Sequence, residues 1–444
     1  MFSKILIANR GEIAIRVIRA CKEMGIASVA VFSEADRESL HVSLADESYC
    51  IGGALSRESY LNMNSVLAAA MASKAEAIHP GYGFLSENAE FAKLCTDNDI
   101  VFIGPDSETI AKMGDKDMAR KTMREAGVPV IPGCDLVRDF AHAKSEAEKI
   151  GFPLLIKARS GGGGRGIRHV SSMDELEHCY NTATAEAASA FGDGAVYIEK
   201  FLFPVKHIEM QLLADNFGNV VCLGERDCST QRKNQKLIEE SPAAIMPDEV
   251  RARMIDVSIK AGKAVGYRGA GTIEYLYDMD GNFYFMEMNT RLQVEHPVTE
   301  MVTLIDLVKW QIRVASGMVL GFSQDDIVFK GCAIECRINA EDPYRDFAPS
   351  VGKIEMLHVP NGPWVRFDSA IYQGYSISPF YDSMIGKLIV YAQSRDEAIR
   401  KMKAALCELI IEGVVHTASF QAELLSSEEF VNSTYTTDYL LKYI

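Results

Sequence analysis

The chain has 444 residues, of which 48% are apolar and 24% are charged, and its formal net charge is -15. This length allows two or three domains with a sizeable core, and the composition is ordinary for a folded enzyme. The negative charge argues against nucleic acid as the main partner, so an anionic substrate would need local basic groups or a metal.

The cysteines and the N-terminal segment bear on location. Ten cysteines are scattered along the chain without a CxxC pair. This usage predicts reduced, mostly buried thiols of a cytoplasmic protein and argues against a zinc site at Cys332 and Cys336. The chain begins with a strand-like segment and not with a signal peptide, and no apolar run reaches the length of a membrane span. We therefore expect no membrane partner.

The first hundred residues predict alternating strands and helices. Residues 5–8 form an apolar run that fits a buried parallel strand. Apolar residues between Ile13 and Met24 recur at helical spacing, Gly25 ends that helix, and residues 29–33 predict a second strand. This βαβ alternation predicts a doubly wound, Rossmann-like α/β domain. The first turn lacks GxGxxG, which argues against a dinucleotide site there.

A shaped loop follows at the end of another strand. Residues 79–88 contain two glycines and a proline around a tyrosine, and they lead into a helix for which Ser86 is the expected cap. The loop could be functional or merely structural. A further strand ends in residues 101–105, and we place the first domain at residues 1–114.

A glycine-rich segment suggests contact with phosphate. Residues 152–158 predict a strand that carries Lys157 near its end, and four successive glycines, 161–164, follow it. Successive glycines cost backbone entropy unless the backbone must approach a ligand, and their N–H groups can hold phosphate. Ile167 and Arg168 follow the last glycine, so this is not a Walker A loop. We expect a nucleotide lid; the alternative is a surface loop without a ligand.

A hairpin later in the chain predicts a metal site. Residues 271–277 predict a strand, residues 280–282 predict a hairpin turn, and the returning strand delivers Glu287. The hairpin would place Glu274 and Glu287 on adjacent strands, where the two carboxylates could share a metal.

Polar side chains then occupy every second position as far as Glu295. If this segment stays extended, Glu287 and Asn289 would offer hard oxygens to one cation. Arg291 would offer a fork for an anion beside it. The alternative is a half-buried strand with a solvated polar face.

Five further segments complete the pattern. Residues 207–212 alternate as an edge or two-faced strand, and residues 231–236 form a cationic run. Residues 333–341 and 386–391 predict strands and residues 395–410 a helix, which together predict a small α+β domain from residue 328.

These residues resemble the ATP-grasp enzymes and, among them, the biotin carboxylases, which include a subunit of bacterial acetyl-CoA carboxylase. The resemblance covers almost the whole chain, and its most specific parts are residues 287–300 and 335–341. It implies a Rossmann-like N-terminal domain (1–114), an ATP-grasp domain (115–327) with a mobile lid subdomain at about 131–203, and a small α+β C-terminal domain (328–444). The other matching motifs are residues 8–12, 79–88, 113–116, 157 with 161–166, and 199–200.

The resemblance also implies a role for each matching residue. ATP would be bound by Lys116, Lys157, Gly163, Gly164, Glu199, Lys200, Phe201, Leu202, His207, Gln231, Asn234 and Leu276. Mg²⁺ or Mn²⁺ would be held by Glu274, Glu287 and Asn289. Bicarbonate would be bound by Arg291, Gln293 and Val294. Lys236 would lie between bicarbonate and the γ-phosphate, Glu295 would deprotonate bicarbonate, and Arg337 would stabilise the enolate-like biotin oxygen.

The implied reaction is the carboxylation of biotin by ATP and bicarbonate through carboxyphosphate, the first half-reaction of an acyl-CoA carboxylase. We expect acetyl-CoA carboxylase and fatty acid synthesis; the alternatives are propionyl-CoA carboxylase, pyruvate carboxylase or another ATP-grasp carboxylate ligase. A regulatory subunit without turnover would not need the intact polar set. The chain has no Met-Lys-Met, so biotin is expected on a separate carrier protein. Carboxyltransferase subunits and a homodimer are the other expected associations.

Four positions depart from the usual family pattern. Asn234 and Asp438 stand where histidine is common, Leu304 stands where glycine is usual, and Thr417 replaces a common asparagine. None of them belongs to the predicted metal or bicarbonate set. The expected assignment of the catalytic residues therefore does not depend on them.

Overall fold

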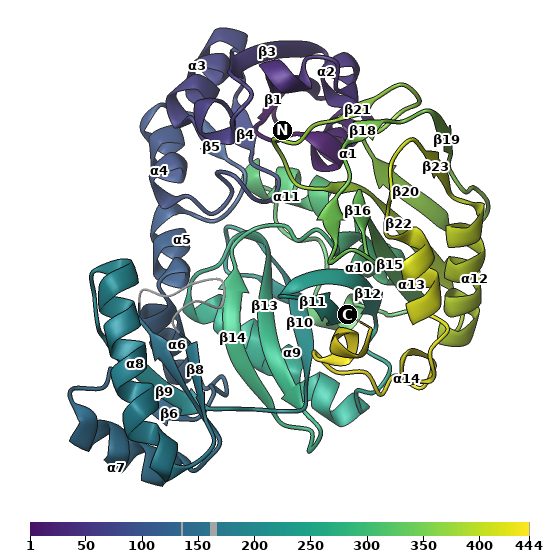
Figure 1. Ribbon diagram of the computed structural model, residues 1–444. Helices are drawn as coiled ribbons and strands as arrows, with labels where there is room; N and C mark the ends of the chain where they lie inside the picture. Colours follow the sequence, from purple (N-terminus) through teal and green to yellow (C-terminus); the bar gives the residue numbers. More distant parts are fainter. Residues whose placement is uncertain (135, 160–166, 444) are drawn as a thin grey trace.

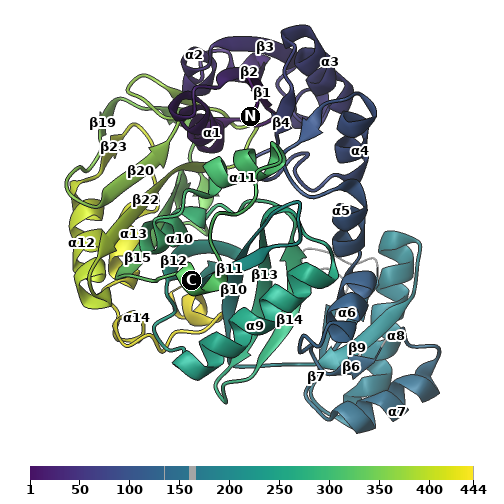
Figure 2. The same cartoon turned by 180° about the vertical axis from the view of Figure 1, so that it is seen from behind.

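The computed structural model describes residues 1–134, 136–159 and 167–443. The glycine-rich segment 161–166, for which the lid was predicted, lies outside these residues. Figures 1 and 2 show three regions, with the N-terminal region at the top and residues 131–203 at the lower corner. None of the described helices combines the length and apolarity needed to cross a bilayer.

The N-terminal region is a five-stranded parallel sheet in the order β3-β2-β1-β4-β5. β1 lies in the middle of the sheet, where Ile5, Leu6 and Ile7 are fully buried between helices on both faces. The predicted Rossmann-like α/β sheet is confirmed. Its elements are β1 (Lys4–Ile7), α1 (Gly11–Glu23), β2 (Ala27–Ser33), α2 (Leu40–Leu44), β3 (Glu47–Gly52), α3 (Met63–Ser73), β4 (Ala77–His79), α4 (Ala89–Asp97), β5 (Val101–Phe102) and α5 (Ser107–Gly114).

The cap expected for α4 was placed two residues too early. Oδ1 of Asn88 accepts the Phe91 N–H at 2.8 Å, so Asn88 and not Ser86 caps the helix. Asparagine is as good a cap as serine, and the chain needs residues 84–87 to complete the preceding turn. The predicted boundary at residue 114 falls at the end of α5; as a domain limit it stays a prediction.

Residues 131–203 contain a small antiparallel sheet in the order β6-β9-β7-β8. Two helices, α7 and α8, contact each other and the same sheet. Figure 1 shows this unit projecting from the rest of the molecule, after helix α6 (Lys116–Glu125). Its elements are β6 (Gly133–Cys134), α7 (Phe140–Ile150), β7 (Leu154–Ala158), β8 (Ile167–Val170), α8 (Met173–Phe191) and β9 (Val196–Lys200).

An eight-stranded antiparallel sheet forms the centre, in the order β14-β13-β10-β11-β12-β15-β22-β20. Residues 207–212 belong to β10, which is not an edge strand, because β10 lies between β13 and β11 and is buried along its whole length. The strands are β10 (Val205–Ala214), β11 (Val220–Arg232), β12 (Gln235–Ser241), β13 (Gly269–Asp278), β14 (Phe283–Asn289), β15 (Cys332–Asn339), β20 (Val365–Ser369) and β22 (Met384–Ala392). Helix α9 (Asp248–Ala264) packs on β10 and β11, and Figure 2 shows it in front of them.

The C-terminal region continues this sheet. β12 pairs with β15 in register from Ile238 and Cys336 to Ser241 and Ala333, so the ladder runs unbroken into the last hundred residues. The other elements after β14 are α10 (His296–Thr303), α11 (Leu307–Ala315), β16 (Glu341–Asp342), β17 (Ala348–Pro349), β18 (Gly352–Lys353), β19 (Met356–His358), β21 (Ser376–Ile377), α12 (Arg395–Glu408), β23 (Ile410–Glu412), α13 (Ala418–Leu424) and α14 (Glu428–Val431).

The polar run after Glu287 is extended only in part. β14 ends at Asn289, and Glu295 occupies the N-terminal cap position of α10. The expectation of one extended strand through Glu295 is therefore wrong beyond Asn289. Pro297 favours the first turn of a helix, which accounts for the change of direction.

Candidate active site

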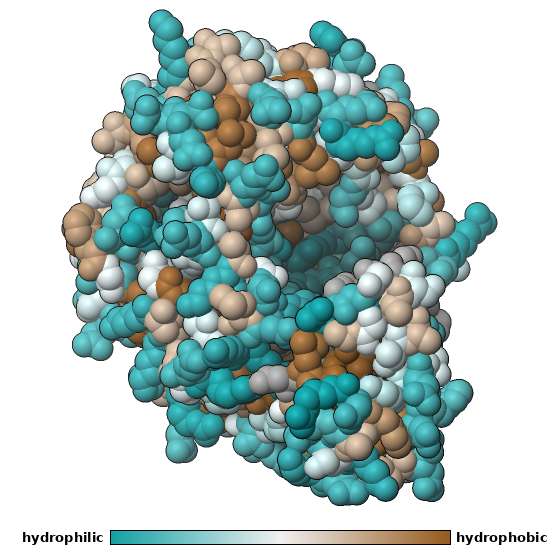
Figure 3. Space-filling view, turned by 90° about the vertical axis from the view of Figure 1, so that its left-hand side faces the viewer, coloured by the Kyte–Doolittle hydropathy of each residue, from teal (hydrophilic) through white to brown (hydrophobic). Residues whose placement is uncertain are grey.

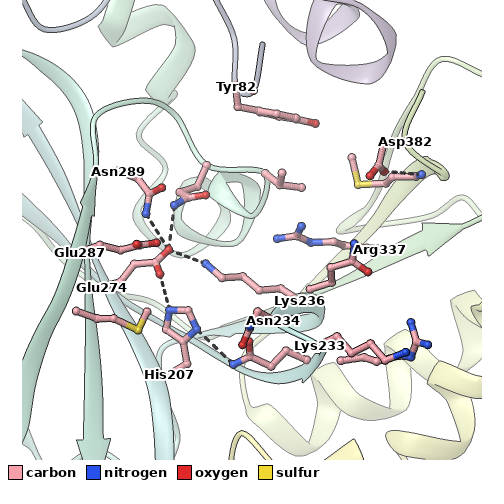
Figure 4. Close-up of a pocket in the computed structure, with 18 of the residues that line it drawn as sticks. Tyr82, His207, Lys233, Asn234, Lys236, Glu274, Glu287, Asn289, Arg337 and Asp382 are labelled. Atoms are coloured by element: carbon pink, nitrogen blue, oxygen red, sulfur yellow. Dashed lines mark hydrogen bonds and ion pairs between the residues drawn. The ribbon is translucent and has the colours of Figure 1, made fainter. Parts of the chain in front are cut away.

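A cavity of about 1300 Å³ lies where the three regions meet. Its walls carry Tyr82 from the N-terminal region, Lys157 from β7, Glu274 from β13 and Arg337 from β15. Figure 3 shows a deep hollow with hydrophilic residues inside it, and Figure 4 shows side chains converging from different strands. The cavity is large enough for a nucleotide together with a second substrate.

The structure brings most of the predicted site residues to this cavity. Glu295 is fully buried behind it, and the side chain of Lys200 donates instead to the carbonyls of Gly151 and Phe152 at 3.1 and 2.7 Å. Phe201 and Leu202 do not line the cavity, and Gly163 and Gly164 lie outside the described residues. The predicted residues that line it are Lys116, Lys157, Glu199, His207, Gln231, Asn234, Lys236, Glu274, Leu276, Glu287, Asn289, Arg291, Gln293, Val294 and Arg337.

The predicted β13–β14 hairpin places two carboxylates side by side. Glu274 and Glu287 are direct partners in the ladder, as the turn signal predicted. The register shifts after this pair, because Tyr275 faces Phe285 and leaves Met286 as an extra residue whose side chain reaches the cavity. Burial and the neighbouring Glu274 raise the pKa of Glu287. A cation between the two carboxylates would relieve that repulsion.

The other atoms around this pair also suit a hard cation. Nδ2 of Asn289 donates to Oε1 of Glu274 at 2.9 Å, and Nε2 of His207 lies 2.8 Å from Oε2 of the same carboxylate. Ligand atoms of His207, Glu209 and Glu274 lie within 4.8 Å of one another. The carboxylate oxygens of Glu209, Glu274 and Glu287 fit Mg²⁺ or Mn²⁺. Asn289, in contrast, turns its NH₂ to Glu274 and its Oδ1 to Arg291.

Lys236 forms the hub of the site. Its Nζ lies 2.8 Å from Glu209 Oε2, 3.0 Å from Glu274 Oε1 and 2.7 Å from Glu295 Oε1. Although burial disfavours the ammonium, the three carboxylates raise the pKa of Lys236 well above its ordinary value. The lysine is therefore a fixed positive charge at neutral pH.

Glu209 was missed by the sequence analysis. It is fully buried on β10 and pairs with both Lys236 and the buried guanidinium of Arg226. The signal was present, because His207, Glu209 and Gln211 alternate along one strand. Only the histidine was assigned a role, since a central strand with one polar face buried looks like an edge strand in sequence.

Arg291 is held at the cavity wall by hydrogen bonds to three side chains and to the Leu292 carbonyl. Its Nε donates to Glu87 Oε2 at 2.7 Å, its Nη2 to Asn289 Oδ1 at 3.0 Å, and its Nη1 to Gln293 Oε1 at 3.0 Å. Val294 lines the same wall, and its carbonyl accepts from Lys387 at 2.7 Å. The predicted anion-binding residues are thus close together. The contact between Glu87 and Arg291 was not predicted from the sequence.

Arg337 and Lys236 meet at a single carboxylate. Nη2 of Arg337 donates to Glu295 Oε2 at 2.8 Å, and its Nε donates to Glu239 Oε1 at 2.6 Å. Burial raises the pKa of Glu295, but Lys236, Arg337 and Arg226 together lower it well below the usual carboxylate range. Glu295 is therefore ionised at neutral pH, which is the form a general base needs.

The other end of the cavity carries the predicted nucleotide contacts. Lys157 forms an ion pair with Glu199, and Nε2 of Gln231 lies 3.4 Å from Nδ1 of His207. Asn234 stands in the β11–β12 turn beside Lys233, and both have positive φ angles of 67° and 48°. Asparagine tolerates this conformation better than most residues.

Hydrogen bonds account for Thr417 and Asp438, whereas nothing in the described residues explains Leu304. Leu304 ends α10 in the left-handed region at φ 59° and is 75% exposed, so its side chain gains nothing in packing. Thr417 is buried, and its hydroxyl accepts the Asn339 N–H at 3.0 Å and donates to the Arg337 carbonyl at 3.2 Å. Asp438 lines the cavity and accepts a hydrogen bond from Thr436.

Comparison with known proteins accounts for almost the whole chain. Three family models match in succession: "Biotin carboxylase, N-terminal domain" at residues 1–110, "Carbamoyl-phosphate synthase L chain, ATP binding domain" at 115–322, and "Biotin carboxylase C-terminal domain" at 335–442. Biotin carboxylase 1 of Bacillus subtilis is 54% identical over 445 residues, which cover 100% of this chain and 99% of that protein.

Two solved structures are similar over the same length. The biotin carboxylase of Campylobacter jejuni, in a β,γ-ATP complex, has a TM-score of 0.94 and 51% identity, covering 100% of this chain and 99% of that one. The biotin carboxylase domain dimer of Hydrogenobacter thermophilus 2-oxoglutarate carboxylase, with MgADP, ADP and bicarbonate, has a TM-score of 0.92 and 50% identity, covering 100% and 98%.

Proposed function

This chain belongs to the biotin carboxylase family of ATP-grasp ligases, and we propose which of its residues perform each part of the reaction. Its activity is the ATP-dependent carboxylation of biotin by bicarbonate. One observation supports the residue assignment above all: Lys236 and Arg337 hold the same buried carboxylate, Glu295, from opposite oxygens. Glu295, the proposed base, is thus hydrogen-bonded to Lys236, which faces the anionic substrate, and to Arg337, which faces biotin.

The first step is the activation of bicarbonate. Arg291, Gln293 and the Val294 N–H bind the anion, and Glu295 takes its proton. The oxyanion then attacks the γ-phosphorus of ATP, and the bond to the bridging oxygen breaks to give carboxyphosphate and ADP. Lys236 stabilises the negative charge between the two reactants. Glu274, Glu287 and Asn289 would hold Mg²⁺ or Mn²⁺, which would there offset the negative charge of the nucleotide phosphates.

The second step transfers the carboxyl group. Carboxyphosphate breaks into CO₂ and phosphate, and the phosphate takes the proton of the biotin ureido nitrogen. That nitrogen then attacks CO₂. Arg337 stabilises the negative charge that develops on the ureido oxygen, and a water-excluding site protects carboxyphosphate from hydrolysis.

The nucleotide is bound at the other end of the cavity. Lys116, Lys157 and His207 contact its phosphates, together with the backbone of Gly163 and Gly164. Gln231, Asn234 and Leu276 lie at the same end of the cavity as these groups. We assign adenine to the segment from Glu199 through Lys200 and Phe201 to Leu202, of which Glu199 alone lines the cavity within the described residues. Lys157 exchanges its ion pair with Glu199 for the phosphate when ATP binds.

The test is the release of ADP by the purified chain. With bicarbonate, Mg²⁺ and ATP, release should be slow, and free biotin or an added biotinylated carrier should accelerate it. ¹⁴C-bicarbonate should then appear on the biotin. If ADP release depended on an amino or carboxylate substrate and not on biotin, another ATP-grasp ligase activity would replace this one.

The partners are also proposed. Biotin is carried by a separate carrier protein, carboxyltransferase subunits use the product, and the chain forms a homodimer, as in the dimeric Hydrogenobacter structure. Ten free cysteines are typical of a reducing compartment such as the cytoplasm. Acetyl-CoA is the proposed final acceptor, because the motifs of the sequence resemble those of the biotin carboxylase subunit of bacterial acetyl-CoA carboxylase. The 50% identity to a 2-oxoglutarate carboxylase domain makes a keto acid the alternative. Reconstitution with each transferase would separate them.

A further inference from the structure

A buried carboxylate behind Arg337 has no place in the mechanism so far. Glu335 is fully buried on β15, and no N–H or O–H group among the described residues donates to either of its oxygens. A carboxylate without hydrogen bonds or a cation is costly to bury. The side chain therefore needs a proton or a partner.

The strand register shows which group is nearest. Glu335 and Glu239 are direct partners across the β12–β15 ladder, so their Cβ atoms are about 5 Å apart. Glu239 uses Oε1 to accept from Nε of Arg337 at 2.6 Å, and its Oε2 is buried without a partner. The unpartnered Oε2 of Glu239 thus lies on the residue paired with Glu335, and a proton on Glu335 would give that oxygen a hydrogen bond.

The surrounding cations are already bound elsewhere. Arg337 donates to Glu239 and Glu295, and Lys387, opposite Arg337 on β22, lies 3.1 Å from Glu12 and donates to the Val294 carbonyl at 2.7 Å. The face under α10 is otherwise closed by apolar side chains: Val298, Val302, Ala333, Ile389 and Tyr391. The charged or titratable groups that influence Glu335 or its neighbour Lys387 are Glu239, Arg337, Lys387, Glu295, Glu12, Asp368, Arg366, Tyr82 and His296.

We propose that Glu335 is a protonated carboxylic acid that donates its hydrogen to Oε2 of Glu239 and thereby positions Arg337. The inference rests on the proposed role of Arg337 toward biotin. Residues 335 and 337 lie on the same face of β15, so a fixed Glu239 carboxylate sets the direction of the guanidinium beside it. Burial and the nearby Glu239 raise the pKa of Glu335 well above its usual range, although Lys387 opposes them. Burial also raises the pKa of Glu239, but Arg337 limits that rise to about 7, so the proton belongs on Glu335. Glu335 acts on Arg337 only through Glu239 and is therefore a positioning residue.

The test compares two substitutions of similar size. Glu335→Gln keeps a neutral hydrogen-bond donor, whereas Glu335→Leu removes it. We expect E335Q to keep biotin carboxylation within about twofold. We expect E335L to lose about tenfold in kcat, the cost of one unsatisfied buried group, while its biotin-independent, bicarbonate-dependent ATP hydrolysis is largely retained. Equal losses in both variants, or full activity in both, would overturn the proposal.

A second readout does not depend on activity. A protonated carboxylic acid has a carbonyl stretching band in the infrared, and the wild-type spectrum at neutral pH should contain one that E335Q lacks. Its absence would also overturn the proposal. On raising the pH, wild-type carboxylation should fall as Glu335 ionises beside Glu239, and this alkaline loss should be smaller in E335Q.

One control separates this inference from the proposed role of Arg337. Arg337→Ala should lose biotin carboxylation far more than ATP hydrolysis, and Arg345→Ala, on an arginine whose side chain is 84% exposed, should lose neither. If R337A loses both activities equally, the role of Arg337 fails. If R337A behaves as expected and the Glu335 variants do not, only the positioning role fails.

Discussion

The ammonium of Lys236 on β12 donates to Oε1 of Glu295 at 2.7 Å, although the two residues are 59 positions apart in the chain. Lys236 is the strongest of the cationic influences that lower the pKa of Glu295. The proposed base is therefore kept ionised by the same side chain that faces the substrate anion.

Lys236→Gln should shift the pH dependence of the reaction. Removing the cation raises the pKa of Glu295, and the base is active only when ionised, so the acidic limb of kcat/KM for bicarbonate should move to higher pH. The rate at its optimum should also fall by about a hundredfold or more, as for other lost electrostatic contacts. A lower rate with an unmoved acidic limb would show that Glu295 is not the group titrated.

Glu287→Gln should abolish turnover while the fold survives. The amide keeps the shape of the side chain but removes one of the two facing carboxylates, so the affinity for Mg²⁺ should fall sharply. Steady-state ADP release across a Mg²⁺ series measures this. Glu148→Gln, an exposed acid on α7, is the matched control and should match the wild type. Near-normal release by E287Q at ordinary Mg²⁺ would contradict the metal assignment.

Leu304→Gly should stabilise the protein. Leu304 has φ 59°, a conformation that costs a leucine about 1–2 kcal/mol and a glycine almost nothing. Glycine also increases the conformational entropy of the unfolded chain, which offsets part of this stabilisation. We therefore expect a net gain of about 1 kcal/mol in the free energy of unfolding. Urea unfolding measures it. Leu304→Val, which keeps a strained branched side chain, should be less stable than the wild type.

Two buried histidines should make the protein lose stability in weak acid. Burial lowers the pKa of both His41 and His79 from 6.5 to about 4. Between those values the unfolded chain binds protons that the folded chain does not. The free energy of unfolding should therefore fall as the pH drops from 6.5 to 4, by up to about 3 kcal/mol for each histidine.

Chemical unfolding at several pH values within this range tests the expectation. His79→Asn keeps an acceptor for the Gly81 N–H, which His79 Nδ1 accepts at 3.0 Å, and should reduce the slope of stability with pH. An unchanged slope would mean that carboxylates dominate the acid response.

Local signals predicted the parts of the site that depend on neighbouring residues. The turn at 280–282 and the alternation after it placed Glu274 and Glu287 on paired strands. The polar run also contained Glu295, but not the helix start that turns it away from the strand. Propensities describe a few residues at a time, whereas the path after Asn289 is set by the packing of α10 on β15.

Other features depended on partners far away in the chain. The central position of β10 could not be predicted, because its polar residues Glu209 and Gln211 are satisfied by Arg226 across the sheet. The hydrogen bond from Arg291 to Glu87 joins residues that are 204 positions apart in the chain. Neither contact leaves a pattern in one sequence.

The shared ladder between β12 and β15 has a consequence for any attempt to divide the protein. Cutting the chain near residue 327 would leave each piece with a bare row of backbone donors and acceptors along a strand that normally has a neighbour. Such exposed strand edges pair with the strands of other molecules, so each fragment expressed alone would aggregate. If the two fragments are expressed together, they should associate with each other, because each supplies the strand with which the other pairs.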